Sequence, residues 1–98
     1  MTASRIPTWV RVMVCNMFHG YCGIEGCTCR GEEIHHKLSN SKSNVAAFPL
    51  FINSVFNLVL ICRKHHLDGK ALRSVRVTAR QAMIFEEFLE KLIGKGKV

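Results

Sequence analysis

The sequence predicts one small α+β domain with two short strands, a helix after the second strand and a bound metal. Three observations lead to this prediction. Residues 33–38 fit a short strand, and the apolar run that begins at Asn57 fits a second strand over 57–61. An amphipathic pattern over 78–93 predicts a terminal helix. Two pairs of residues have the spacing of metal ligands, namely Cys22 with Cys27 and Cys62 with His65.

The length of 98 residues predicts a single domain, 1–98, with a modest core. Small domains of this kind often depend on a metal or on disulfides. No secretory signal and no apolar run of membrane length is evident, so we expect no membrane association and a cytoplasmic protein. The five cysteines should then be reduced and available to zinc.

The formal net charge of +7 favours a polyanionic partner such as DNA, although solubility alone would also account for it. Five basic residues lie in or beside the histidine-containing segments and are candidate DNA contacts: Lys37, Lys42, Arg63, Lys64 and Lys70.

Two interpretations remain open for 6–18. Pro7 favours a helix that begins there, whereas the β-branched Val10, Val12 and Val14 favour a strand. In either case we expect Trp9 in the core. The glycine-rich segment that follows can form a tight metal-binding loop.

In the middle of the chain, secondary structure can be predicted for some segments and not for others. After the strand at 33–38, the polar residues of 39–44 predict a loop. Residues 45–56 are apolar but contain Pro49, and no element is assigned to them. Their Phe48–Ile52 stretch fits burial in the core better than a docking or dimer surface.

The second strand, 57–61, leads into a helix over 62–70 that ends near Gly69. Thr78 is the expected N-cap of the terminal helix, which should end before Gly94. Its predicted core face holds Phe85, Phe88, Leu89 and Leu92, and its predicted polar face holds Glu86, Glu87, Glu90 and Lys91.

The two ligand pairs together would make a closed Cys3His site for structural zinc. Zinc sites of this kind supply on the order of 10 kcal/mol, which compares with a total stability of about 5–10 kcal/mol for a small domain. Cys29 competes with Cys22 or Cys27 for a place in the site, although one residue between Cys27 and Cys29 is cramped for a single ion. Cys15 fits a buried apolar position.

Two histidine-containing segments, Glu33-Ile-His-His-Lys-Leu38 and Asn57 through His66, resemble the HNH nuclease family and its ββα-metal fold. The resemblance covers about 22–70. It favours a helix before the first cysteine pair, and it favours Cys27 over Cys29 as a zinc ligand. The chain departs from most relatives at His65, where a cysteine is usual, and at Lys70, where some have a further histidine.

The resemblance implies a metal-dependent DNA endonuclease or nickase. His36 would be the general base, His35 and His66 would hold the divalent ion, and Asn57 would fix the loop and orient the base. With so few protein ligands the ion would be Mg²⁺ or Mn²⁺ at least as readily as zinc. Neighbours in a regular strand point to opposite faces, so His35 and His36 can share one site only if the strand twists or bulges there.

Two other functions fit part of the sequence. A zinc-knuckle module that binds DNA without turnover explains the cysteines and the charge, but not the histidine pairs and Asn57. Small HNH proteins of this type occur in phages and prophages, in the bacterial cytoplasm, so a nuclease that needs a phage packaging partner or a homodimer is the third interpretation. Plasmid cleavage that depends on Mg²⁺ or Mn²⁺ separates the first function from the second.

Overall fold

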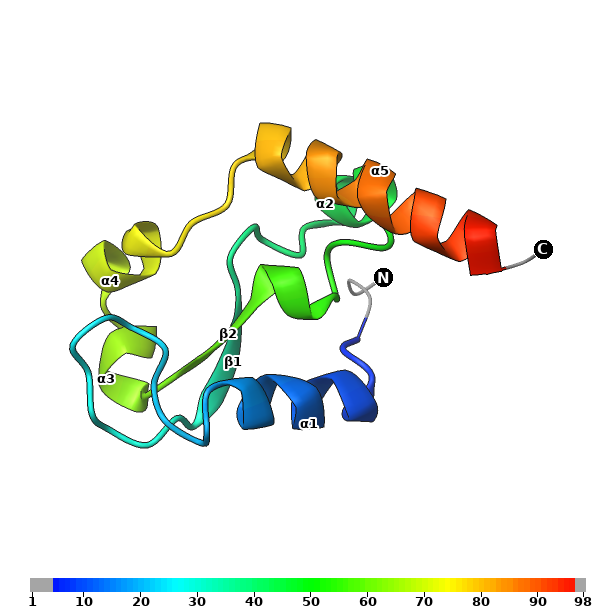
Figure 1. Cartoon of the computed structure of the whole chain (residues 1–98). Coiled ribbons are helices and arrows are strands. Elements are labelled where there is room, and N and C mark those ends of the chain that lie inside the picture. The colour runs from blue at the N-terminus through cyan, green and yellow to red at the C-terminus, as the bar shows by residue number, and fades with distance from the viewer. Residues whose placement is uncertain (1–4, 97–98) are drawn as a thin grey trace.

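The computed structural model describes residues 5–96, with side chains to residue 94, and confirms a small α+β fold (Figure 1). Five α-helices, one 3-10 helix and two strands are found in these residues. Their order is α1 (Thr8–Met17), β1 (Glu33–His36), α2 (Lys42–Ala47), η1 (Val55–Asn57), β2 (Leu58–Ile61), α3 (Arg63–His66), α4 (Gly69–Ser74) and α5 (Ala79–Gly96).

The sheet is a single antiparallel pair, β1 with β2, in a register without a bulge. Glu33 lies opposite Ile61, Ile34 opposite Leu60, His35 opposite Val59, and His36 opposite Leu58. Cross-strand partners project to the same face and consecutive residues to opposite faces. The register therefore assigns every side chain of the hairpin to one of two faces.

Helix α1 covers one face of the hairpin. Val10 and Val14 are buried there together with Ile6, Leu58 and Leu60. Helix thus prevails over strand for 8–17, and Pro7 stands at its N-cap. The placement of Trp9 in the core was wrong, since its side chain is 66% exposed. Successive helical residues differ by about 100°, and burial of Val10 and Val14 turns Trp9 outward.

The middle segment adds a helix where a loop was predicted. Ser41 caps α2 by accepting a hydrogen bond from the Asn44 backbone N–H. The polar residues after Ser41 therefore begin a helix instead of a turn. Phe51 and Ile52, which follow, are almost completely buried. The predicted burial of Phe48–Ile52 is therefore confirmed for these two residues.

The predicted helix over 62–70 is two short helices, α3 and α4. Gly69 begins α4 and does not end the first helix. The Asp68 carboxylate accepts hydrogen bonds from the N–H groups of Lys70 and Ala71 and is the N-cap of α4. A cap at this position favours a new helix start over continuation of the first helix.

Helix α5 begins with a capping box. The Gln81 N–H donates to the Thr78 hydroxyl, while the Thr78 N–H donates to the Gln81 side chain, which confirms Thr78 as the cap. The helix passes Gly94 and extends to Gly96. Figure 1 shows α1 and α5 on opposite sides of the hairpin. Within the described residues no helix combines the length and the apolar character that crossing a membrane requires.

Candidate metal centre

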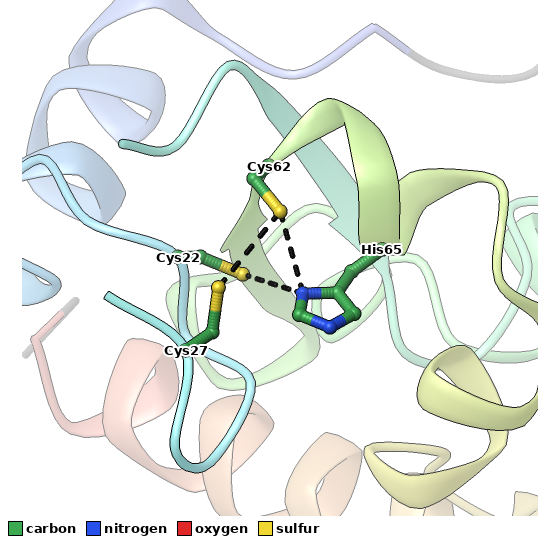
Figure 2. A group of neighbouring side chains, drawn as sticks. All are labelled: Cys22, Cys27, Cys62 and His65. Atoms are coloured by element: carbon green, nitrogen blue, oxygen red, sulfur yellow. Dashed lines mark hydrogen bonds between the residues drawn. The ribbon is translucent and has the colours of Figure 1, made fainter. Parts of the chain in front are cut away.

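Four metal-binding side chains meet at the open end of β2, on the hairpin face opposite α1. Cys22 and Cys27 come from the loop after α1, while Cys62 and His65 flank the start of α3 (Figure 2). The His65 Nδ1 lies 3.3 Å from the Cys62 Sγ and 3.5 Å from the Cys22 Sγ, and the Cys27 Sγ lies 3.9 Å from the Cys62 Sγ. All four ligand atoms are within 4.8 Å of one another.

These distances fit a tetrahedral ion. Ligands at about 2.3 Å for sulfur and about 2.0 Å for nitrogen place two sulfurs about 3.8 Å apart and a sulfur about 3.5 Å from a nitrogen. The set of three thiols and one imidazole is a typical zinc donor set. The four residues predicted as ligands could therefore hold a metal ion such as zinc, with no coordination position left over.

Glycines allow the loop to reach this geometry. A Cβ on Gly23 would lie 2.6 Å from the Phe18 ring and 2.7 Å from the Val59 side chain, which is closer than carbon atoms approach. Gly26 has φ of +82°, in the region that favours glycine. The loop is also tied to the strand by a hydrogen bond from the Gly23 N–H to the Leu60 carbonyl. The glycines therefore let the first cysteine pair approach β2.

The thiols differ in acidity. Hydrogen bonding from the His65 backbone N–H, the largest effect, lowers the pKa of Cys62 to about 7. Burial raises the pKa of Cys22. Because metals bind thiolates, Cys62 is the ligand that is most nearly prepared for binding at neutral pH, whereas Cys22 must lose a proton.

Cys29 lies outside the group. Its side chain is exposed. Its backbone carbonyl contacts the group, because it accepts a hydrogen bond from the Cys22 N–H at 2.8 Å. Cys27 therefore occupies the position for which the two competed. Cys15 is half-buried, as a small apolar residue would be. It packs against the cluster under α1, which we call the α1 cluster and which consists of Ile6, Val10, Val14, Leu58 and Leu60.

A second group of side chains lies on the same face of the hairpin. Glu33 and His35 project there from β1, and the Glu33 Oε2 is 3.6 Å from the His66 Nε2. Burial lowers the pKa of His35, and the nearby His66 and His36 lower it further. Among the described residues, only the Cys3His group brings three or more ligand atoms within 4.8 Å, so this second group is more open.

One nitrogen of the His66 imidazole is buried without a hydrogen-bond partner among the described residues. This nitrogen is Nδ1. A carboxylate beside Nε2 favours the proton on that nitrogen, which leaves the lone pair on Nδ1. An ion or a water at Nδ1 would satisfy it. The imidazoles of His66 and His35 are donors that fit a divalent cation, with the Glu33 carboxylate as the partner that fixes the His66 tautomer.

The two adjacent histidines do not share a face. His36 lies opposite Leu58 and projects toward α1, whereas His35 projects toward α3. The strand has no bulge that would bring both to one side. The His36 Nε2 is instead 2.9 Å from the Asn53 Oδ1. The resemblance needs His35 as an ion ligand and His36 as the base to serve one site, and the regular strand does not turn both side chains to one face.

Asn57 is completely buried and holds the segment that follows β1. Its Nδ2 donates to the carbonyls of Leu38 and Ile52, each at 3.0 Å, and its Oδ1 accepts from the Leu38 N–H at 2.8 Å. These hydrogen bonds tie Leu38 and Ile52 to the residue that precedes β2. The partner that orients His36 is Asn53, which no sequence argument singled out.

The candidate DNA contacts lie on different elements. Lys42, Arg63, Lys64 and Lys70 are exposed on α2, α3 and α4. Lys37 is half-buried, and burial lowers its pKa. The sequence argument also missed Glu33, although its position two residues before His35 on a strand already placed both on one face.

The chain was compared with protein-family models, with curated proteins and with solved structures, and nothing matched.

Proposed function

We propose that the chain is a metal-dependent DNA endonuclease or nickase with a ββα-metal core of β1, β2 and α3 and with zinc in the Cys3His group. The observation that supports this most is the buried, unpartnered Nδ1 of His66, on the face of the hairpin to which His35 also projects. Zinc at His65 would fix α3 and so position His66, the next residue along the helix.

The proposed reaction is hydrolysis of a phosphodiester bond by water. A Mg²⁺, Mn²⁺ or Zn²⁺ ion held by His35 and His66 would stabilise negative charge on the phosphate and the leaving oxygen. His36 is the proposed base. With Nε2 donating to the Asn53 Oδ1, the proton stays on Nε2 and Nδ1 can accept a proton from the attacking water. His36 is the last residue of β1, so we place the scissile phosphate across this end of the strand.

The test is nicking of supercoiled plasmid by zinc-loaded protein with added Mg²⁺ or Mn²⁺. His36→Ala should lower the rate by about 100-fold or more, the usual contribution of a general base, while zinc content and DNA binding stay unchanged. His19→Asn is the matched control, because His19 is exposed and its φ of +55° suits asparagine. Nicking by His36→Ala at the wild-type rate would show that His36 is not the base.

One observation favours a second function, a zinc-containing DNA-binding or adaptor module without turnover. The two strand histidines point to opposite faces, and the basic residues require no catalysis. Wild-type protein that binds DNA tightly but nicks with neither Mg²⁺ nor Mn²⁺ would support this alternative. Nicking that appears only when phage packaging proteins are added, or only in a homodimer, would support the third interpretation.

A further inference from the structure

We propose that a hollow between the end of β1 and the α4–α5 connection binds a phosphate of the DNA backbone through Lys37, Arg73 and Arg76. The hollow has a volume of about 540 Å³. One wall is formed by residues at the end of β1, including His35 and His36, and the other by the last turn of α4 and the connection. The identity of the polymer as DNA rests on the proposed function.

The charges around the hollow are of one sign. Lys37, Arg73 and Arg76 line it, together with neutral polar residues such as Asn44 and Thr78, and no carboxylate is among its lining residues. Arginine and lysine are the side chains that most often contact DNA phosphates. Three cations around one hollow repel each other, and a bound phosphate would remove that repulsion.

Within the part of the chain that the structure describes, the two arginines have no acidic partner. Only His66 and Glu33 bring a basic nitrogen and a carboxylate oxygen within 4.0 Å of each other among the described residues. Neither Arg73 nor Arg76 therefore lies in an ion pair there. Both arginines are exposed. A carboxylate in an ion pair would compete with phosphate, and here none has to be displaced.

The backbone keeps the cations close together. The Val77 N–H donates to the Lys37 carbonyl at 3.3 Å, which ties the α4–α5 connection to the segment after β1. The Arg76 N–H donates to the Arg73 carbonyl at 3.2 Å, so the two arginines lie on one turn. Lys37 is half-buried, which leaves its ammonium less hydrated than one on an open surface.

The hollow also adjoins the proposed base. His35 and His36 both line it. A phosphate held there would belong to the same strand as the scissile phosphate, a short distance along the backbone. The arginines would then position the strand against β1 without taking part in the chemistry.

The experiment is fluorescence anisotropy with a labelled 16-base-pair duplex, zinc-loaded protein and no added Mg²⁺ or Mn²⁺, over a range of salt concentrations. Loss of two phosphate contacts in R73A/R76A should weaken binding roughly 10- to 100-fold at about 0.1 M salt, and should reduce the slope of log K against log salt by about 2. R73K/R76K should restore most of the affinity, because a lysine still contacts phosphate as a point charge.

The control is R11A/K91A, which also removes two exposed charges but on α1 and α5, away from the hollow. It should leave the salt slope nearly unchanged. Equal losses in both double variants would overturn the inference, since the effect would then follow net charge alone. Circular dichroism and zinc content confirm that each variant is folded.

The outcomes separate this inference from the proposed function. Wild-type protein that binds through the hollow but never nicks would refute the nuclease and leave the phosphate site intact. Wild-type protein that nicks, with R73A/R76A binding as tightly as wild type, would refute the phosphate site alone.

Discussion

The buried carboxylate of Glu86 joins α5 to the segment that carries the core residue Phe51. Its Oε1 accepts hydrogen bonds from the backbone N–H of Phe51 at 2.8 Å and of Leu50 at 3.0 Å. The side chain is only 5% exposed. Buried charges are rare unless their hydrogen bonds are satisfied, and here two backbone donors satisfy one carboxylate.

Glu86→Ala should lower the free energy of unfolding by about 3 kcal/mol, because it removes two hydrogen bonds to a charged group and leaves buried N–H donors without an acceptor. Glu86→Gln keeps one acceptor oxygen and should cost less. Urea denaturation of the zinc-loaded protein measures both values. Glu87→Ala, at the exposed neighbouring position, should change stability by less than about 0.5 kcal/mol. Equal effects of Glu86→Ala and Glu87→Ala would show that the contact does not stabilise the fold.

Single residues differ in how far the sequence predicts them. The spacing of the two ligand pairs was enough to predict that Cys22, Cys27, Cys62 and His65 lie together, because close pairs of thiols and imidazoles have few other uses. The exposure of Trp9 and the burial of Glu86 were not predictable in this way. Periodicity assigns apolar residues inward and charged residues outward, whereas the tertiary packing here does the reverse at both positions.

At the scale of elements, α3 connects the two groups of side chains. This four-residue helix begins immediately after Cys62 and contains both His65 and His66. Too short to be stable alone, it depends on its contacts with β1 and α4. Metal at Cys62 and His65 would hold both ends of its first turn. The geometry of His66 then depends on the metal.

The N–H that α3 donates to Cys62 predicts how zinc affinity changes with pH. Above about pH 7 Cys62 is a thiolate in the metal-free protein, whereas below pH 7 zinc must displace its proton. Cys22, with its raised pKa, releases a proton throughout this range. Zinc affinity should therefore fall with falling pH. Below about pH 7 the slope of log K against pH should increase by about one, because zinc then displaces one more proton. Competition with a chromophoric chelator from about pH 6 to pH 8.5 measures this.

Cys29→Ser is the matched control for this titration. Its side chain lies outside the site, so the curve should keep its shape. An affinity that does not depend on pH would contradict the ionisation assigned to the cysteines.

The elements themselves were largely predictable, and their ends were less so. Both strands were expected within one or two residues, and for β2 the reason is an apolar run with β-branched residues, which favours a strand. The division of 62–70 into α3 and α4 was missed, because Gly69 was expected to end the first helix, whereas Asp68 caps the start of a second one at Gly69. Likewise, no pattern in 33–38 determines whether the strand bulges at the histidines, and this decides where His36 points.

At the scale of the whole molecule, the hairpin is packed from both faces by small clusters. Ile6, Val10 and Val14 cover one face, and on the other Cys22 and Cys62 pack directly against Val59 and Ile61. The second cluster is thus built in part from residues that could hold a metal ion. A domain of 98 residues has little core to spare, so loss of this face should open the hairpin.

Removal of the metal should therefore unfold the protein. Binding of zinc to a site of this type is worth about 10 kcal/mol or more, at least as much as the total stability expected of the domain. We expect one zinc per chain by native mass spectrometry, and loss of cooperative thermal unfolding by circular dichroism after treatment with a strong chelator. Cys62→Ser should reproduce the effect of the chelator, whereas Cys29→Ser should bind zinc and melt like the wild type. A cooperative transition in the metal-free protein would show that the α1 cluster suffices for folding, and α3 with His66 would then have to be held by packing alone.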